Sequence, residues 1–221
     1  PSSCSNYGRI KKNQIADEKF KLKPLTNYSK ANSLLEKDIL KLKSKRFCVV
    51  VLRQGTVYGF SPRMRFDLAV NRMTYECWKN QSLPLMKDGS QRRPTLHIKD
   101  AMKAMKFMLE TKIEKINGQI FNVGGENNNY TMLKLGNEIR ELFKKKIKIK
   151  WYGSKDHRSY YVSFKKIQKI GFKTKFTPID GAREIIKNLD KGKISFSPDT
   201  VTLDWYNILE HWRKKLKNMM I

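Results

Sequence analysis

The sequence predicts an α/β fold in which a mainly parallel sheet is covered by helices. Two apolar runs, FCVVVL at 47–52 and GQIFNVG at 118–124, have the hydrophobicity of strands that are buried on both faces. Segments with apolar residues at helical spacing lie between these runs and around them. Strands that alternate with helices in this way are typical of a parallel sheet.

The remaining elements follow from periodicity and capping. Apolar residues at helical spacing predict a helix over 30–43, where Leu34, Leu35, Ile39 and Leu42 recur, and further helices near 66–80 and 99–111. Thr131 is suited to cap a helix over 131–145. Short extended segments are expected at 94–98 and in KIKIKWYG, which alternates like an exposed strand.

Composition limits the classes of partner. The chain has 221 residues, of which 39% are hydrophobic, which suits one domain or one domain with a small lobe. Its formal net charge is +27, from 47 Lys and Arg against 20 Asp and Glu. Lysine is spread along the whole chain beside abundant Asn and Ile, so we interpret the charge as a compositional bias of the surface rather than a nucleic-acid interface. A phosphate-bearing small substrate would also benefit from this charge.

Targeting and metal signals are absent from the sequence. No apolar run approaches the roughly 18 residues of a membrane span, and the first residues do not resemble a signal peptide. We therefore expect a cytoplasmic protein without membrane association. Cys4, Cys48 and Cys77 form no CxxC pair, so we expect reduced cysteines and no metal site.

Five stretches, in this order, carry a resemblance to a known family: SSCSNYG, PLTNYSKANSLLEK, VVVLRQGTVYG, DGSQRRPTLHIKDAMKAM and GQIFNVGGENNNYT. Together they resemble the second half of an extended short-chain dehydrogenase/reductase. The closest subgroup is the nucleotide-sugar epimerases and dehydratases, and the resemblance covers roughly residues 1–190. It implies the last strands of a Rossmann-like parallel sheet with a small C-terminal α/β substrate-binding lobe.

The resemblance also implies a division of the chain. Residues 1–60 would end the NAD(P)-binding domain and carry the catalytic segment, 61–192 would be mainly the substrate-binding lobe with a strand-helix return to the sheet, and 193–221 would be a helical extension. No G-x-G-x-x-G occurs in the sequence. We therefore expect a fragment that binds NAD or NADP only together with an N-terminal half, and a homodimer in the full-length form.

The family's chemistry is acid-base catalysis on a sugar hydroxyl, coupled to hydride transfer to the nicotinamide. By resemblance, Ser3 matches the Ser/Thr that hydrogen-bonds the reacting oxygen, and Tyr28, 25 residues later, matches the catalytic tyrosine. The family has a lysine four residues after this tyrosine, where it also faces the cofactor. This chain has Asn32 there, which has no charge to favour ionisation of a phenol. The nearby Lys30 should point elsewhere on the helix.

Five further residues match substrate-facing positions of the family. Arg93 matches an arginine that contacts the nucleotide diphosphate, a task that suits a guanidinium fork. Thr56 stands where many members have Asn, and Asp67 occupies another substrate-facing position, although an acid at a helix start equally well stabilises the dipole. Asp156 matches a position near the nucleotide ribose, and Arg158 beside it would contact phosphate. His97, between Leu96 and Ile98, is interpreted as structural.

Two function classes remain open. The first is an NAD(P)-dependent nucleotide-sugar epimerase, or a related reductase or dehydratase, acting on a nucleotide-sugar substrate. Dehydratases of the family usually carry an Asp-Glu pair just after the Ser/Thr, where this chain has Cys4 and Ser5, and this difference favours an epimerase or reductase. The alternative is a truncated or impaired homologue that binds a nucleotide sugar or a partner, because Asn32 departs from the family pattern.

The end of the chain lies outside the resemblance. In LDWYNILEHWRKKLKNMMI, apolar residues recur at helical spacing from Trp205 to Met219, beside a basic cluster at 213–217. We expect this helix to pack on its own domain or on a neighbouring subunit. A helix lying on a membrane surface is the second interpretation, because basic amphipathic helices with tryptophan bind anionic interfaces.

Overall fold

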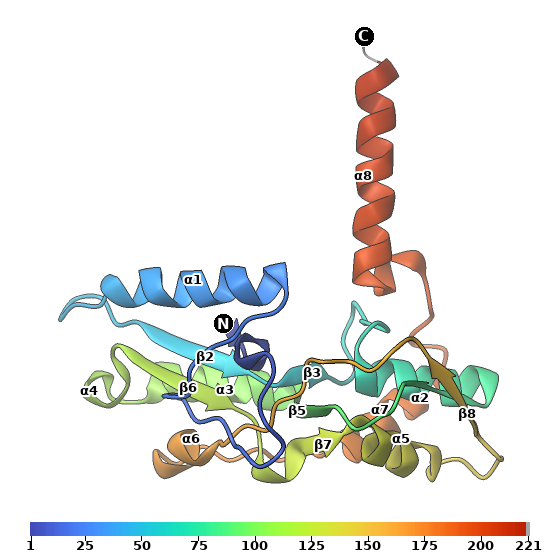
Figure 1. Ribbon diagram of the computed structural model, residues 1–221, viewed down its shortest axis with the longest axis horizontal. Coiled ribbons are helices and arrows are strands. Elements are labelled where there is room, and N and C mark those ends of the chain that lie inside the picture. Colours follow the sequence, from blue (N-terminus) through green and yellow to red (C-terminus); the bar gives the residue numbers. More distant parts are fainter. Residues whose placement is uncertain (220–221) are drawn as a thin grey trace.

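The computed structural model describes residues 1–219. A three-stranded parallel sheet, called the main sheet below, lies on the left in Figure 1. Its strands are β1 (Ser2–Ser3), β2 (Val50–Gln54) and β6 (Gln119–Val123), in the order β1-β2-β6. β2 pairs with β6 along its whole length, from Val50 opposite Gln119 to Gln54 opposite Val123. The predicted α/β fold and its two buried strands are confirmed, although β2 begins after the exposed Phe47 and Cys48.

Helices cover this sheet. α1 (Asn27–Lys41) lies along one side of it, above the strands in Figure 1. α3 (Ile98–Glu110) and α6 (Lys165–Lys169) share an apolar cluster with the strands, which includes Leu52, Met108, Phe121, Phe164 and Ile167. The predicted helices at 30–43 and 99–111 are therefore present. The buried residues of α1, however, are Ser29, Ser33 and Glu36 rather than its leucines.

Two smaller sheets lie beside the main sheet, on the right in Figure 1. β3 (Thr56–Tyr58) pairs in parallel with β5 (Arg92–His97), which pairs antiparallel with β7 (Asn129–Thr131). β4 (Ser82–Met86) and β8 (Lys148–Tyr152) form a parallel pair. α2 (Ala69–Asn80), α5 (Met132–Arg140) and α7 (Pro178–Asp190) pack on these strands, through an apolar cluster that includes Val70, Leu83, Leu135 and Ile139. Short helices complete the fold: η1 (Cys4–Tyr7), α4 (Ile113–Ile116), η2 (Glu126–Asn128) and η3 (Pro198–Thr200).

The last helix, α8 (Thr202–Met219), stands away from the rest of the chain in Figure 1. None of its residues is buried, and the side chains of Trp212 and Leu216 are more than half exposed. Packing on its own domain, one of the two arrangements expected for this helix, is therefore not found. Among residues 1–219, no helix has the length and apolar character needed to cross a membrane.

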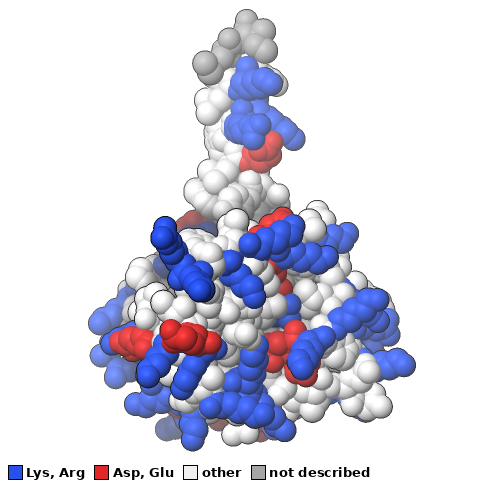
Figure 2. Space-filling model, turned by 90° about the vertical axis from the view of Figure 1, so that its left-hand side faces the viewer, with Lys and Arg blue, Asp and Glu red and all other residues white. Residues whose placement is uncertain are grey.

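The positive charge is dispersed over the face of the molecule that Figure 2 shows. Figure 2 shows Lys and Arg side chains scattered over the visible face and along the outer part of α8, without a single continuous stripe. Acidic side chains lie among them. This distribution agrees with the interpretation of the charge as a surface bias.

Candidate functional site

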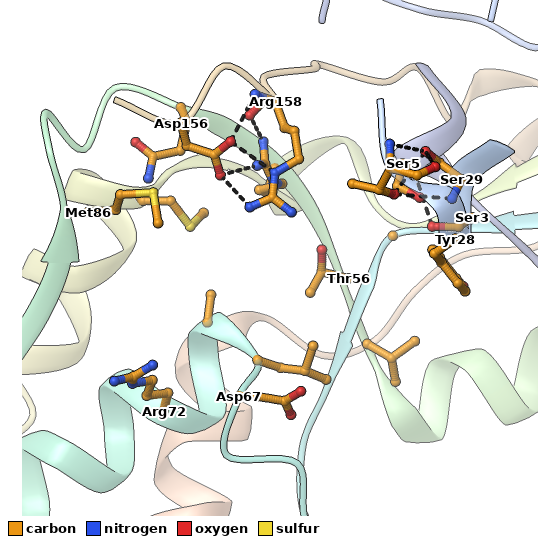
Figure 3. A pocket seen from close by; sticks show the side chains of 18 of the residues that line it. Ser3, Ser5, Tyr28, Ser29, Thr56, Asp67, Arg72, Met86, Asp156 and Arg158 are labelled. Carbon is orange, nitrogen blue, oxygen red and sulfur yellow. Dashed lines mark hydrogen bonds and ion pairs between the residues drawn. The ribbon is translucent and has the colours of Figure 1, made fainter. Parts of the chain in front are cut away.

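A pocket of about 790 Å³ lies where the main sheet meets the two smaller sheets (Figure 3). Its volume falls within the range of about 300–1,000 Å³ that is usual for small-molecule sites. Seven of the eight residues proposed from the sequence line it: Ser3, Tyr28, Thr56, Asp67, Arg93, Asp156 and Arg158. The eighth, Asn32, is not among the lining residues.

One end of the pocket is rich in hydroxyl groups. Ser3 ends β1 and caps η1, because its Oγ accepts a hydrogen bond of 3.1 Å from the Ser5 amide. A hydroxyl that accepts in this way still has its proton free for donation to a ligand. Tyr28 lies in the first turn of α1, which begins after the N-cap Thr26, and its side chain is 63% exposed. In Figure 3, Ser3 and Tyr28 lie on the same side of the pocket.

Asn32 lies one turn after Tyr28 but is turned to the backbone. Its Nδ2 donates a hydrogen bond of 2.9 Å to the Tyr28 carbonyl, and the residue is half-buried. Lys30 is exposed and does not line the pocket. The hydroxyl end is therefore lined by uncharged side chains, chiefly Ser2, Ser3, Ser5, Thr26, Tyr28, Ser29, Gln54 and Thr56.

A pair of arginines shares one aspartate at the middle of the pocket. The carboxylate of Asp156 accepts from Arg93 at 2.8 Å and, through both of its oxygens, from Arg158 at 2.9 Å. Arg93 also donates to the Arg158 carbonyl, and its guanidinium lies 5.0 Å from the centre of the Tyr160 ring. The side chain of Arg93 is only 13% exposed, whereas that of Arg158 is 49% exposed. Arg158 is thus the more accessible of the two to a ligand.

The charge of this cluster follows from its contacts. Burial works against the ionised Asp156, but hydrogen bonds from Arg158 and the charges of both arginines hold the pKa of that carboxyl below its usual value. Burial lowers the pKa of Arg93, while the hydrogen bond to Asp156 raises that of Arg158. Arginine ordinarily titrates far above neutral pH, so both guanidinium groups stay charged there. One carboxylate therefore leaves a net positive charge here.

Asp67 is neutralised by a neighbour. Its carboxylate accepts from Arg65 through both oxygens, at 3.2 and 2.7 Å. Asp67 stands just before Leu68, the N-cap of α2, so the alternative of an acid near a helix start also fits its position. Arg65 was not identified from the sequence, because it belongs to no motif there.

The other end of the pocket is apolar and aromatic. Met86 ends β4 beside Tyr152 of β8, and Pro84 and Met73 lie in the same lining. The Arg72 guanidinium lies 5.7 Å from the centre of the Tyr152 ring. Flat apolar and cationic groups of this kind suit a planar heterocycle. In all, four arginines and two aspartates line the pocket, which gives a net charge of +2.

Three buried polar atoms at the pocket have no partner within residues 1–219: Ser5 Oγ, Gln54 Nε2 and Gln91 Oε1. Buried polar atoms are ordinarily hydrogen-bonded, so an unpaired group needs an explanation. A polar ligand in the pocket would supply one. All three lie within stretches that resemble the family, but the sequence did not show that their side-chain atoms are buried at the pocket.

His97 lies outside the pocket, as its structural interpretation requires. Its side chain is 1% exposed, its Nε2 lies 3.0 Å from Glu184, and its Nδ1 accepts from the Lys99 amide. The ring stacks on Phe176 with 4.5 Å between centroids. Burial lowers the pKa of His97, so the ring is neutral near pH 7. Within residues 1–219, no group of three His, Cys, Asp or Glu could hold a metal ion.

Comparisons with known proteins agree on one family. The family model described as the NAD dependent epimerase/dehydratase family matches residues 1–124. The UDP-D-apiose/UDP-D-xylose synthase 2 of Arabidopsis thaliana is 37% identical over 67 residues, which are 30% of this chain and 17% of the plant protein.

Two solved structures resemble the fold over most of the chain. The dTDP-glucose 4,6-dehydratase of Bacillus anthracis, in complex with NAD, is 25% identical with a TM-score of 0.73, and the match covers 87% of this chain and 61% of that one. The UDP-glucuronic acid 4-epimerase of Bacillus cereus, in complex with UDP-glucuronic acid and NAD, is 23% identical with a TM-score of 0.72, over 86% of this chain and 60% of that one. The chain thus spans about three fifths of the length of these structures.

Proposed function

This chain belongs to the NAD-dependent epimerase/dehydratase family, and we propose that it forms the nucleotide-sugar side of an epimerase active site. The observation that supports this proposal most is the single pocket that joins Ser3 and Tyr28 to the Arg93, Asp156 and Arg158 cluster. A nucleotide sugar has a hydroxylated ring, a diphosphate and a planar base. The pocket offers hydroxyl groups, a net positive charge and an aromatic end in the same order.

The diphosphate would lie at the arginines. Its two negative charges match the pocket's net charge of +2, and a guanidinium can donate two parallel hydrogen bonds to phosphate oxygens. The base would lie between Arg72, Met86 and Tyr152. This orientation places the sugar near Thr56, with its reacting hydroxyl between Ser3 and Tyr28.

The reaction would begin with proton transfer at that hydroxyl. Tyr28 would take the proton as the general base, and Ser3 would donate a hydrogen bond to the same oxygen with the proton that its contact with Ser5 leaves free. NAD or NADP, when bound, would accept and return the hydride. Tyr28 and Asn32 are the residues of this chain that would face the nicotinamide ribose.

The polar side chains at the hydroxyl end suit hydrogen bonds to such a cofactor. Tyr28 is 63% exposed, and Ser5 Oγ and Gln54 Nε2 are buried without partners among the described residues. No glycine-rich dinucleotide motif occurs in the sequence, so this part of the protein would supply the nicotinamide side rather than the pyrophosphate side.

An epimerase is favoured over a dehydratase by the residues after Ser3. Elimination of water needs an additional acid and base, and this chain has Cys4 and Ser5 there. Cys4 is buried, its Sγ donates to the Arg53 carbonyl, and burial raises the pKa of the thiol. A neutral, buried thiol is a poor substitute for a carboxylic acid.

The second candidate, an impaired homologue that binds a nucleotide sugar, is favoured by Asn32. Its amide is engaged with the Tyr28 carbonyl and supplies no positive charge to a phenolate. We also propose that the protein is cytoplasmic and that its full-length form is a homodimer. The chain would divide into the segments 1–60, 61–192 and 193–221.

Turnover by the complete natural polypeptide separates the two candidates. UDP-glucose and dTDP-glucose are incubated with the protein and NAD, and products are followed by chromatography. An epimerase should lose at least about 100-fold in kcat with Tyr28→Phe, because general acid-base catalysis contributes about that much or more. Tyr206→Phe is the control, since Tyr206 has the same exposed fraction and lies on α8. Tight binding of either nucleotide sugar without turnover would support the second candidate.

A further inference from the structure

The helix that carries Tyr28 is held to the sheet by polar groups. The buried residues of α1 are Ser29, Ser33 and Glu36, whereas Leu34 and Leu35 are 61% and 54% exposed. Helices in proteins usually gain their stability by burying an apolar face. The inward face of α1 offers little apolar surface, so its position depends on the hydrogen bonds and charges of that face.

Glu36 is the centre of these contacts. Its carboxylate is 4% exposed and accepts from Arg53 of β2 at 2.6 Å, with further contacts to the same guanidinium at 3.0 and 3.1 Å. It also accepts from Ser2 Oγ at 2.5 Å and from Asn6 Nδ2 at 2.9 Å. One side chain thus joins α1 to β1, η1 and β2.

Arg53 extends the network across the sheet. It donates to the Tyr7 hydroxyl at 3.0 Å, and Tyr7 donates to Asn122 Oδ1 of β6 at 2.7 Å. Burial raises the pKa of Tyr7, so the hydroxyl keeps its proton for this contact. The charged pair is therefore fully hydrogen-bonded, which is the condition under which a buried ion pair is tolerated.

The network ends beside the proposed catalytic groups. Ser2 immediately precedes Ser3, and the pairing of β1 with β2 places Ser2 opposite Arg53 and Ser3 opposite Gln54. Glu36 lies eight residues after Tyr28 on the same helix, which is about 12 Å at 1.5 Å per residue. Both hydroxyls are thus attached to elements that the Glu36 carboxylate joins.

We propose that Glu36 and Arg53 are positioning residues that fix the separation of the Ser3 and Tyr28 hydroxyls. This inference rests on the proposed function, in which both hydroxyls act on one sugar oxygen. Small displacements of reacting groups lower turnover strongly, by about 100-fold for a shift of about 1 Å. The proposed function places the diphosphate at Arg93 and Arg158, which do not belong to the Glu36 network. Changes at Glu36 and Arg53 should therefore leave substrate affinity nearly unchanged.

Stability and positioning can be separated by an apolar replacement. Removing one partner of a buried ion pair leaves an unpaired charge, whereas replacing both by apolar residues of similar volume often leaves stability unchanged. The informative variant is therefore the double substitution Glu36→Leu with Arg53→Met. Arg53→Lys serves as a second variant, because it keeps a positive charge beside Glu36 and removes the guanidinium fork. Asp38→Asn is the control, since Asp38 is an exposed acid on the same helix whose partner is the exposed Lys41.

The experiment measures unfolding, turnover and hydrogen exchange in the complete natural polypeptide. The double variant should unfold near the wild-type midpoint, lose at least about 10-fold in kcat, and keep KM within about twofold. The amides of α1 should exchange at least tenfold faster than in the wild type, while Asp38→Asn changes none of these quantities. Arg53→Lys should lower kcat and speed the exchange of the α1 amides if the double variant does not fold.

Wild-type kcat in the double variant at wild-type stability would overturn the inference. Unchanged exchange of the α1 amides would overturn it as well, even if no nucleotide sugar is converted. Absence of turnover in the wild type, together with faster α1 exchange in the variants, would count against the proposed function and leave the Glu36 network as the attachment of α1.

Discussion

Arg158→Met should weaken nucleotide binding while leaving the fold intact. The Arg158 side chain is 49% exposed and its carboxylate partner, Asp156, keeps Arg93 at 2.8 Å, so its removal leaves no buried charge unpaired. A hydrogen bond to a charged group contributes about 1.5–3 kcal/mol, and the exposure of Arg158 favours the lower end of this range. A loss of about 1.4 kcal/mol corresponds to a tenfold weaker affinity.

Calorimetric titration with UDP measures this loss. Lys155→Met is the matched control, because Lys155 precedes Asp156, is exposed, and does not line the pocket. UDP affinity should fall about tenfold in Arg158→Met and stay within about twofold in Lys155→Met. Equal losses in both variants would show that UDP responds to the general positive charge of the surface, and an unchanged affinity in Arg158→Met would remove Arg158 from the site.

Two other predictions concern turnover and stability. In the complete polypeptide, Asn32→Lys should place an ammonium one turn from Tyr28. Turnover should then rise by part of the roughly 100- to 10,000-fold range of acid-base catalysis, and the pH optimum should move toward neutrality. An unchanged pH-rate profile would show that another group assists Tyr28. The unfolding free energy should fall as the pH is lowered from about 6.5, by at most about 1.4 kcal/mol per pH unit, because the unfolded chain protonates His97 while burial lowers its pKa in the fold. Urea titrations at pH 7.5 and 5.5 measure this slope, which His97→Gln should reduce; an equal slope in that variant would assign it to other groups.

The main strands were predictable because each lies in a run that is largely apolar. β2 and β6 are buried on both faces, and such strands give continuous hydrophobic runs. β4 was missed because it contains Pro84, a residue that ordinarily argues against a strand interior. The pairing of β4 with β8 depends on residues 66 positions apart, which no local pattern reveals.

Helix α1 shows where periodicity fails. Apolar spacing predicted the helix correctly, but Leu34 and Leu35 face outward and the inward face is Ser29, Ser33 and Glu36. Spacing identifies a helix without identifying which face is buried, since a polar network can replace an apolar contact. The partner of Glu36 is Arg53, which lies on a strand that otherwise reads as apolar.

The pocket was predictable only in part. The resemblance to a family pointed to Ser3, Tyr28 and Arg93 through motifs, and the fold brings them to one cavity. Arg72 reaches the same cavity from a helix that carries no motif, and Gln54 reaches it from a strand end whose motif assigned it no role. Their role depends on convergence in space, which requires the structure.

A crystal structure of the complete polypeptide with UDP-glucose would show whether a nucleotide sugar binds in this pocket. We expect the diphosphate within hydrogen-bond distance of Arg93 or Arg158, the base beside Tyr152, and a sugar hydroxyl within about 3 Å of both Ser3 and Tyr28. A nucleotide sugar bound outside this pocket, or bound in it with the base at the Ser3 end, would contradict the proposed function.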